Sequence, residues 1–408
     1  MNRDDFALLR EDFPTLRGEN VPIYFDNACM TLKPDSVIQA IQTYYNEHPS
    51  CGGRSVHRYA MSVTRKMMDA RRRMGSFINA PDHNEVVFTK NATHSLNQIA
   101  KGQSWEKGDI VLTSDREHNS NLIPWLQLER EKGVDHRVIP SLEDNTFDFE
   151  CFEEMCAEAG SNLKMVSLPQ VGNLDGVEFP VKEACKVVHD HGGLMVVDAA
   201  QSAPHMPVDV QDLGVDYIAF SLHKMLGPSG MGALWGRKEL LDEMRTITAG
   251  GDTVAWSEYA DFEWSKAPHK FEGGLGNYAG IIGTGAAIEY LSGMDMQRIH
   301  EHEIKINNIV SNGIRDLDGI EIIGPQDAQK RGGICSMLIH GNDAHDLAVI
   351  LDEAGGCMVR SGMHCVHSWF RDKGHEEGSL RASFYFYNTE EEAKTFVDVF
   401  SEIHSSMF

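Results

Sequence analysis

Short runs of apolar residues alternate with amphipathic stretches between about residues 75 and 290 of this 408-residue chain. The apolar runs have the length of strands and lie at 85–88, 109–113, 136–139, 165–168, 194–197 and 216–221. The stretches between them have the periodicity of helices. Such an alternation predicts an α/β fold, in which a mainly parallel sheet is covered by helices on both faces.

A different pattern follows residue 291. After predicted helices at 281–291 and 295–317, strand-like runs lie at 321–323, 334–339, 357–360 and 380–385, and helical stretches lie at 344–351 and 390–403. Strands and helices that are mixed in this way are typical of a smaller α+β domain. The sequence therefore predicts one large domain and one small domain.

Two residues of opposite charge follow two of the buried strands. Asp198 comes directly after the run 194–197, and Lys224 follows the run 216–221 after a short turn. Open α/β sheets bind ligands at the carboxyl ends of their strands, so both side chains are expected at one site. Pyridoxal 5′-phosphate (PLP) chemistry requires such a pair, because a lysine bonds to the cofactor aldehyde and an aspartate keeps the pyridine nitrogen protonated. Taken alone, Asp198 would more simply be a helix cap, and Lys224 a solvated side chain.

Further motifs along the chain add to this pattern and together resemble those of one protein family. They are Tyr24–Ala28, Glu117–Trp125, Phe271–Gly274, Arg360–Cys365, Leu380–Ser383 and Tyr387–Glu391. With Asp198 and Lys224, they resemble the class V aminotransferase fold, and within it the SufS-like (group II) cysteine desulfurase and selenocysteine lyase family. The resemblance covers nearly the whole chain. It implies a homodimeric fold-type I enzyme with PLP as cofactor and a sheet of the seven-stranded type. It also implies a large domain over 21–291 and a small domain formed by 1–20 and 292–408.

The resemblance assigns cofactor contacts around Lys224. His118 would stack on the pyridine ring and relay protons, and Gln201 would hydrogen-bond the cofactor phenolate oxygen. Asn173 would lie near the same side of the cofactor, although a simple turn residue is the competing interpretation. The phosphate would be held at a helix N-terminus and in the lysine loop by Thr93, His94, Ser221 and His223.

Two departures from the family pattern affect the phosphate site. Ala92 stands where a hydroxyl residue is common, and Leu275-Gly276 stands where the family has Thr-Pro. In the family that threonine reaches the phosphate of the neighbouring subunit. Each lost donor is expected to weaken cofactor binding by about 1 kcal/mol.

The resemblance also assigns the substrate pocket and a nucleophile. Arg381 would clamp the substrate carboxylate, because a planar guanidinium pairs with it through two bonds. Asn173, Arg360 and the backbone near Ala28 would complete the pocket. Cys365 would attack the sulfur of the cofactor-bound cysteine, which leaves alanine and a persulfide on the protein.

The surroundings of Cys365 bear on this assignment. Arg360 and His364 would stabilise its thiolate, and the segment 366–374 is interpreted as a polar, mobile loop that leaves the thiol accessible. The alternative is a packed, inert cysteine. Met363 stands where the family often has a second histidine, so proton handling or the preference for sulfur over selenium is expected to differ.

Cys29 and Cys51 admit two interpretations. The simpler one is that both are small buried thiols. The sharper hypothesis is that they converge with Cys365 to relay a persulfide or to bind an iron–sulfur cluster, for which thiolates are the usual ligands. No other metal site is predicted.

Composition excludes several classes of function. The net charge of −24 disfavours direct binding of nucleic acid, which needs clustered Lys and Arg, and the basic run Arg71–Arg73 is interpreted as one exposed helix face. No apolar run approaches the ~20 residues of a membrane helix, and residues 1–5 have no features of a secretory signal. The eight cysteines include no CxxC pair, which argues against a zinc ribbon or a disulfide scaffold. We expect a soluble enzyme of the reducing cytoplasm.

These observations favour a cysteine desulfurase that converts L-cysteine to L-alanine and passes the persulfide sulfur of Cys365 to an acceptor. The expected acceptor is a protein of the SufE or SufU type or a scaffold for iron–sulfur cluster assembly. Three alternatives stay open: a selenocysteine lyase acting on L-selenocysteine, a class V PLP enzyme of other chemistry, and a scaffold that uses Cys29, Cys51 and Cys365.

Overall fold

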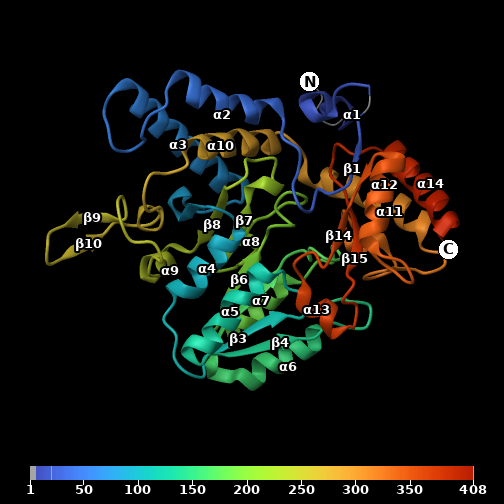
Figure 1. The fold of residues 1–408 in the computed structure, drawn as a ribbon. Coiled ribbons are helices and arrows are strands. Elements are labelled where there is room, and N and C mark those ends of the chain that lie inside the picture. The colour runs from blue at the N-terminus through green and yellow to red at the C-terminus, as the bar shows by residue number, and fades with distance from the viewer. Residues whose placement is uncertain (1–5, 20, 408) are drawn as a thin grey trace.

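The computed structural model describes residues 6–19 and 21–407, and its two largest sheets lie in different parts of the chain (Figure 1). The first sheet contains β2 (Val86–Thr89), β3 (Ile110–Ser114), β4 (Asp135–Ile139), β5 (Leu163–Pro169), β6 (Leu194–Asp198), β7 (Tyr217–Ser221) and β8 (Gly232–Gly236). Their order is β2-β8-β7-β6-β5-β3-β4, with parallel pairing throughout β3 to β7. The predicted α/β fold with a mainly parallel, seven-stranded sheet is confirmed. Residues 1–5 and 20, which the sequence predictions include, lie outside the described residues.

The strand β8 is one that the apolar pattern does not predict. It pairs antiparallel with both β2 and β7, and its first residue, Gly232, ends a glycine-rich turn. A Cβ at Gly232 would lie 2.4 Å from Cα of Asn91. Glycine is therefore needed for β8 to pass this close to the backbone that precedes α4 (Ala92–Gly102).

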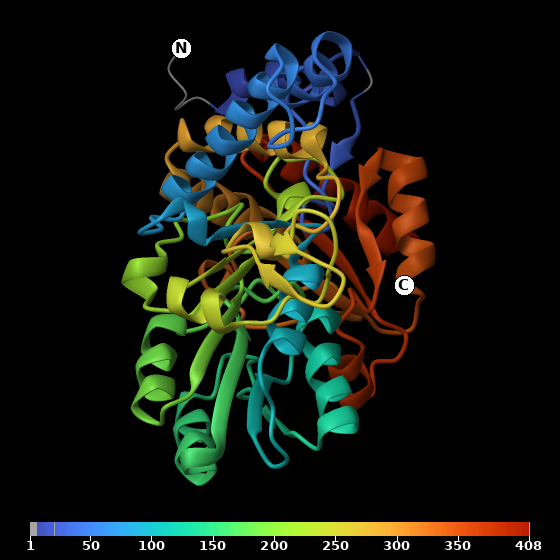
Figure 2. The same ribbon diagram turned by 90° about the vertical axis from the view of Figure 1, so that its left-hand side faces the viewer.

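Side chains of the large sheet alternate between two apolar layers. On β6, Val196 belongs to the same cluster as residues of α4 and α5 (Asn119–Lys132), whereas Met195 and Val197 belong to the cluster on the other face. That second cluster includes α6 (Phe149–Ala159) and α7 (Val181–Asp190). The period of two follows from strand geometry, and Figure 2 shows the helices that flank the sheet.

Three helices pack together beside one end of the large sheet, at the top of Figure 1: α2 (Asp35–Glu47), α3 (Arg58–Phe77) and α10 (Tyr278–Ser292). Although α10 is mostly buried, no helix among the described residues is both long and apolar enough to cross a membrane. The expectation that Arg71–Arg73 form one exposed face is wrong for Arg71. Successive helical residues point in different directions, and Arg71 is buried, with its guanidinium bonded at 2.7 Å to both carboxylate oxygens of Glu272.

The second sheet is antiparallel and has the order β11-β12-β15-β14. Its strands are β11 (Ile320–Ile322), β12 (Ile334–Ile339), β14 (Arg360–Gly362) and β15 (Ser379–Ser383), and the helices beside it are α11 (Met296–Ile314), α12 (Ala344–Gly355) and α14 (Glu390–Met407). The run 357–360, predicted as one strand, divides between β14 and β13 (Cys357–Met358), which pairs in parallel with β1 (Ile23–Tyr24). The exact division into two domains stays a prediction.

The remaining elements are short. They are α1 (Phe6–Leu9), α8 (Val210–Leu213), α9 (Lys238–Glu243), α13 (His367–Asp372) and the hairpin of β9 (Val254–Ser257) and β10 (Phe262–Trp264). The hairpin projects from the body of the molecule in Figure 1 and faces the viewer in Figure 2.

Candidate active site

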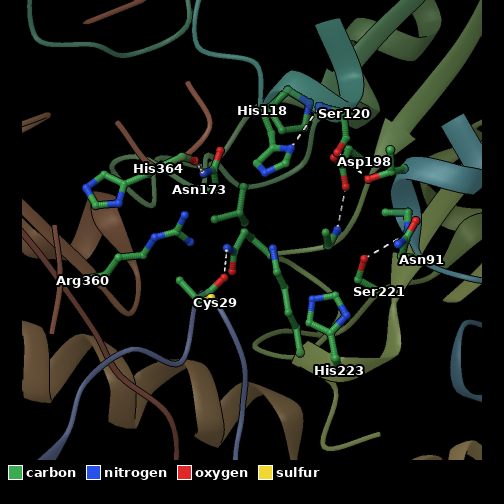
Figure 3. A pocket seen from close by; sticks show the side chains of 18 of the residues that line it. Cys29, Asn91, His118, Ser120, Asn173, Asp198, Ser221, His223, Arg360 and His364 are labelled. Carbon is green, nitrogen blue, oxygen red and sulfur yellow. Dashed lines mark hydrogen bonds between the residues drawn. The ribbon is translucent and has the colours of Figure 1, made fainter. Parts of the chain in front are cut away.

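Neighbouring strands of the large sheet place Asp198 and Lys224 at one cavity of about 210 Å³. Asp198 ends β6, and Lys224 ends the short helical turn that follows β7. The predicted site residues that line the cavity are Ala28, Thr93, His118, Asn173, Asp198, Gln201, Ser221, His223, Lys224, Arg360 and Arg381. In Figure 3, His118 and Asp198 lie on one side of it, and Arg360 and His364 on another. Of the other predicted residues, His94 and Cys365 lie outside this lining.

Burial changes the ionisation of both central residues. Burial lowers the pKa of the Lys224 amine to about 8, partly opposed by the nearby Asp198 carboxylate. Burial raises the pKa of Asp198, while a hydrogen bond of 2.9 Å from the Ala200 amide and the Lys224 charge act in the opposite direction. The amine is therefore closer to its neutral, nucleophilic form at physiological pH than an ordinary lysine.

His118 is held in one orientation by the start of α5. It is the N-cap of this helix, and its Nδ1 accepts a hydrogen bond of 3.0 Å from the Ser120 amide. Burial, and then the charge of Lys224, lower the pKa of His118 to about 3. The ring is therefore neutral, with its proton on Nε2, and it can lie flat against an aromatic ligand.

The N-terminus of α4 forms the polar end of the cavity. Asn91 caps the helix by accepting from the His94 amide at 2.9 Å, and the Ala92 amide donates to Ser221 Oγ at 3.0 Å. Thr93 Oγ1 and Ser120 Oγ lie 2.6 Å apart. Hydroxyls and backbone amides gathered in this way at a helix N-terminus are the kind of donors that could bind a phosphate.

Two predicted phosphate-site positions lie away from this end. His94 lines a neighbouring groove, where its Nδ1 accepts from the Lys90 amide at 3.3 Å. Leu275 lines the same groove and is 66% exposed. The geometry of a single chain thus brings Thr93, Ser221 and His223 to the cavity and leaves His94 beside it.

The side of the cavity that is predicted to bind the substrate carboxylate comes from the second sheet. Arg381 is 1% exposed and donates from Nη1 to the Asn173 carbonyl at 2.8 Å and from Nη2 to Asp26 at 3.5 Å. Its Nε has no hydrogen-bond partner among the described residues. Arg360 stands directly opposite Arg381 in the β14–β15 register. Two facing cations repel, so the pair is arranged to receive an anion in addition to Asp26.

Cys365 lies at the edge of this arrangement in a left-handed backbone conformation. Cys365 has φ +63° and His364 has φ +48°, and such strain in non-glycine residues gathers at functional sites. The Asn119 amide donates to the Cys365 carbonyl at 2.7 Å, and Asn173 Nδ2 donates to the His364 carbonyl at 2.7 Å. Sγ of Cys365 lies 4.0 Å from Nη2 of Arg360. The thiol is partly exposed.

The segment after Cys365 differs from the expected loop. Residues His367–Asp372 form the helix α13, which buries Trp369 and Phe370 in a cluster with Leu174. Because polar residues surround these two aromatic residues in the sequence, the sequence does not predict this small core.

The other two cysteines of the cluster hypothesis lie apart. Cys29 lines the main cavity, whereas Cys51 does not. The described residues of one chain contain no group of three or more His, Cys, Asp or Glu side chains that could hold a metal ion. The cluster hypothesis therefore has no support within a single chain.

A match to a known family accounts for this arrangement. The model of the family described as aminotransferase class-V matches residues 23–396. The chain belongs to this family.

Several relatives are named as cysteine desulfurases. A probable cysteine desulfurase from Methanothermobacter thermautotrophicus is 38% identical, and the match covers 97% of each chain. One from Halalkalibacterium halodurans is 36% identical over 94% of each chain. Among solved structures, the apo cysteine desulfurase of Thermococcus onnurineus has a TM-score of 0.92 at 35% identity and 98% coverage of both chains. The cysteine desulfurase CsdA of Escherichia coli, in an S-sulfonic acid form, has a TM-score of 0.91 at 29% identity and 99% coverage of both.

Class V aminotransferases carry PLP, and the residues of this member fit that group. Asp198 could hold the pyridine nitrogen, Lys224 could bond to the aldehyde, and the N-terminus of α4 could hold the phosphate. Oε1 of buried Gln201 and Nε of buried Arg381 have no partner among the described side chains and backbone. Polar atoms of this kind are what a ligand in the cavity would satisfy.

Sequence reasoning missed several residues of the site. Asp26 contacts Arg381, and Ser120 contacts Thr93. Thr31 and Lys33 hydrogen-bond the turn that carries Lys224. Thr31 Oγ1 donates to the His223 carbonyl at 3.1 Å, and Lys33 Nζ donates to the same carbonyl at 2.8 Å. Asp26 is part of a quoted motif, but nothing in the local sequence of Thr31 or Lys33 indicates their distant partner.

Proposed function

We propose that this chain is a PLP-dependent cysteine desulfurase, which converts L-cysteine to L-alanine and takes the sulfur onto Cys365. The observation that carries the proposal is the position of Cys365. It is a partly exposed thiol in a strained turn, 4.0 Å from Arg360, which itself lines the cavity of Lys224 and Asp198. The relatives that share most of its length bear the same name.

The side chains divide the work between binding and proton transfer. Bound PLP supplies an electron sink for the substrate carbon atoms. Arg381 binds the substrate carboxylate, and Lys224 and neutral His118 move protons at Nζ and Nε2. Burial lowers the pKa of both groups, to about 8 for Lys224 and to about 3 for His118, and so favours their neutral forms.

Cys365 performs the sulfur transfer. Its thiolate forms an S–S bond with the substrate sulfur while the C–S bond breaks. The electron pair of the C–S bond stays on the substrate carbon, which takes up a proton and becomes the methyl group of alanine. The product on the protein is a persulfide.

The partners are part of the same proposal. A homodimer is supported by exposed apolar side chains, among them Val56 at 92% exposure and Leu275, which lines the groove at 273–278, at 66%. The sulfur acceptor is a SufE- or SufU-type protein or a cluster scaffold in the cytoplasm, and L-selenocysteine is a second substrate. The partly exposed thiol supports delivery to a protein partner.

The test is the conversion of L-cysteine by purified protein, measured as alanine and, with a thiol reductant, as sulfide. The PLP-loaded protein is expected to be yellow and active, and Cys365→Ala is expected to keep the colour and lose alanine formation by at least about a hundredfold. Cys151→Ala on α6, away from the cavity, is the matched control and is expected to stay active. An active Cys365→Ala variant would point to class V chemistry without a cysteine nucleophile.

A further inference from the structure

The helix α5 brings a hydroxyl group to the end of the cavity that could hold the phosphate of PLP. Ser120, in the first turn of α5, lines the main cavity together with Asn91, Ala92 and Thr93 at the start of α4. Its Oγ lies 2.6 Å from Thr93 Oγ1, and Figure 3 shows it next to His118. Two helices therefore meet at this end of the cavity, and each contributes a hydroxyl.

The start of α4 has few donors left for a phosphate. Ala92 has no hydroxyl, and its amide already donates to Ser221 Oγ at 3.0 Å. The His94 amide donates to Asn91 Oδ1 at 2.9 Å, and the His94 side chain lines the neighbouring groove. Of the first three amides of the helix, only that of Thr93 has no acceptor among the described residues. A phosphate group presents several strong acceptor oxygens, so this site requires donors from outside α4.

The hydroxyls of Thr93 and Ser120 supply such a donor. Together they carry two hydrogens, and the hydrogen bond between them uses one. No described residue accepts the other hydrogen. Ser221, which is 5% exposed, also keeps its hydroxyl hydrogen free, because its Oγ accepts from the Ala92 amide and no described residue accepts from it. Free hydroxyl hydrogens that line one cavity indicate a ligand rich in acceptors.

The backbone of Ser120 is fixed independently of its hydroxyl. Its amide donates to His118 Nδ1 at 3.0 Å, and the Asn121 amide donates to the His118 carbonyl at 2.7 Å. The half-buried hydroxyl can therefore turn toward a ligand without any movement of the chain. The amide of Ser120 serves the His118 ring, and the hydroxyl is left for a second contact, so a substitution of the side chain tests the two roles separately.

We propose that Ser120 is a phosphate-binding residue, whose hydroxyl donates directly to a phosphate oxygen of PLP in place of the hydroxyl that is absent at Ala92. Thr93 Oγ1 donates to Ser120 Oγ, which leaves the Ser120 hydrogen for the phosphate. A hydrogen bond to an anionic oxygen is stronger than one between neutral hydroxyls. The inference deepens the proposed function and rests on it only in that PLP is the ligand.

Titration of the apoprotein with PLP and with pyridoxal, which has the same ring and aldehyde but no phosphate, tests this role. In Ser120→Ala the dissociation constant of PLP is expected to rise about fivefold to tenfold, whereas that of pyridoxal is expected to stay within about twofold of the wild type. Ser104→Ala, at an exposed serine just beyond the C-terminus of α4, is the control and is expected to bind both ligands normally. Unchanged PLP affinity in Ser120→Ala would overturn the proposal. Equal losses for PLP and pyridoxal would overturn it too, because they would assign Ser120 to the orientation of His118.

A crystal structure of the PLP-loaded wild type tests the contact without any substitution. Ser120 Oγ is expected within hydrogen-bond distance of a phosphate oxygen. An Oγ that bonds only Thr93 and lies beyond that distance would overturn the proposal. Neither experiment measures alanine formation, so a protein that binds PLP through Ser120 but produces no alanine would contradict the proposed function alone.

Discussion

At the scale of single residues, the lysine loop depends on Thr31, which is 1% exposed. Its Oγ1 donates to the His223 carbonyl at 3.1 Å and accepts from the Leu226 amide at 3.0 Å. Leu226 has φ +59°, a conformation that an ordinary residue holds only when its surroundings enforce it. Thr31 therefore holds both ends of the turn that presents Lys224.

Thr31→Val is expected to lower the free energy of unfolding by about 1–3 kcal/mol, because it keeps the shape but leaves the Leu226 amide buried without a partner. The looser turn is also expected to release PLP faster. Urea denaturation and the dissociation rate of the cofactor measure the two effects. Thr31→Ser is the matched control, since it keeps the hydroxyl. If the valine and serine variants behave alike, the hydroxyl does not hold the loop.

At the scale of elements, the approach of β8 to the start of α4 is tight. A Cβ at Gly232 would lie 2.4 Å from Cα and 2.6 Å from both N and C of Asn91, which are all backbone atoms. Backbone cannot rotate away as a side chain can, so Gly232→Ala has to displace either the strand or the helix cap. Because Asn91 caps the helix that would hold the phosphate, the displacement is expected to reach the cofactor site.

Gly232→Ala is expected to lower the free energy of unfolding by at least about 2–3 kcal/mol and to weaken PLP binding. Gly251→Ala is the control, because its new Cβ would meet only the far end of Arg54 at 3.7 Å, and it is expected to change stability by less than about 0.5 kcal/mol. Thermal unfolding of the apoproteins and PLP titration measure both effects. A Gly232→Ala protein as stable as the control would contradict the close approach.

The strands also show which parts of the fold can be predicted from the sequence. The central parallel strands β3, β5, β6 and β7 are buried and mostly apolar, so their own sequences predict them. The edge strand β4 is only partly buried, and its sequence gives a weaker signal. The strand β8 begins in a glycine-rich turn and does not stand out, because its need for glycine comes from Asn91, which is far away in sequence. The site residues divide in the same way. Asp198 and Lys224 directly follow predicted strands and can be found from the sequence, whereas the hydrogen bond of Thr31 to the His223 carbonyl joins distant segments and appears only in the folded chain.

At the scale of the whole molecule, burial gives several titratable groups a different pKa in the folded chain than in the unfolded chain, so stability depends on pH. Burial lowers the pKa of four histidines to about 3 or 4, namely His118, His136, His205 and His223. The unfolded chain binds protons at these positions below its ordinary histidine pKa, and the folded chain does not. Their contribution to stability is therefore complete above about pH 6.5 and is lost as the pH falls toward 4. Glu117 acts in the opposite sense, because burial raises its pKa to about 8, so its contribution is lost as the pH rises from about 4.5 to 8.

His136 allows this acid sensitivity to be measured away from the active site. It lies on the edge strand β4, where its Nε2 is 2.9 Å from Thr113 Oγ1, and burial lowers its pKa to about 4. In His136→Gln the titrating group is absent, so the variant is expected to lose less stability than the wild type between pH 7 and 4. The difference between the two proteins is expected to change by up to about 3 kcal/mol, the equivalent of the pKa shift. Urea denaturation at several pH values measures it, with Thr113→Val as a variant that keeps the histidine. Parallel curves of stability against pH for wild type and His136→Gln would show that His136 titrates normally in the fold, and that the edge of the sheet is wetter than its geometry indicates.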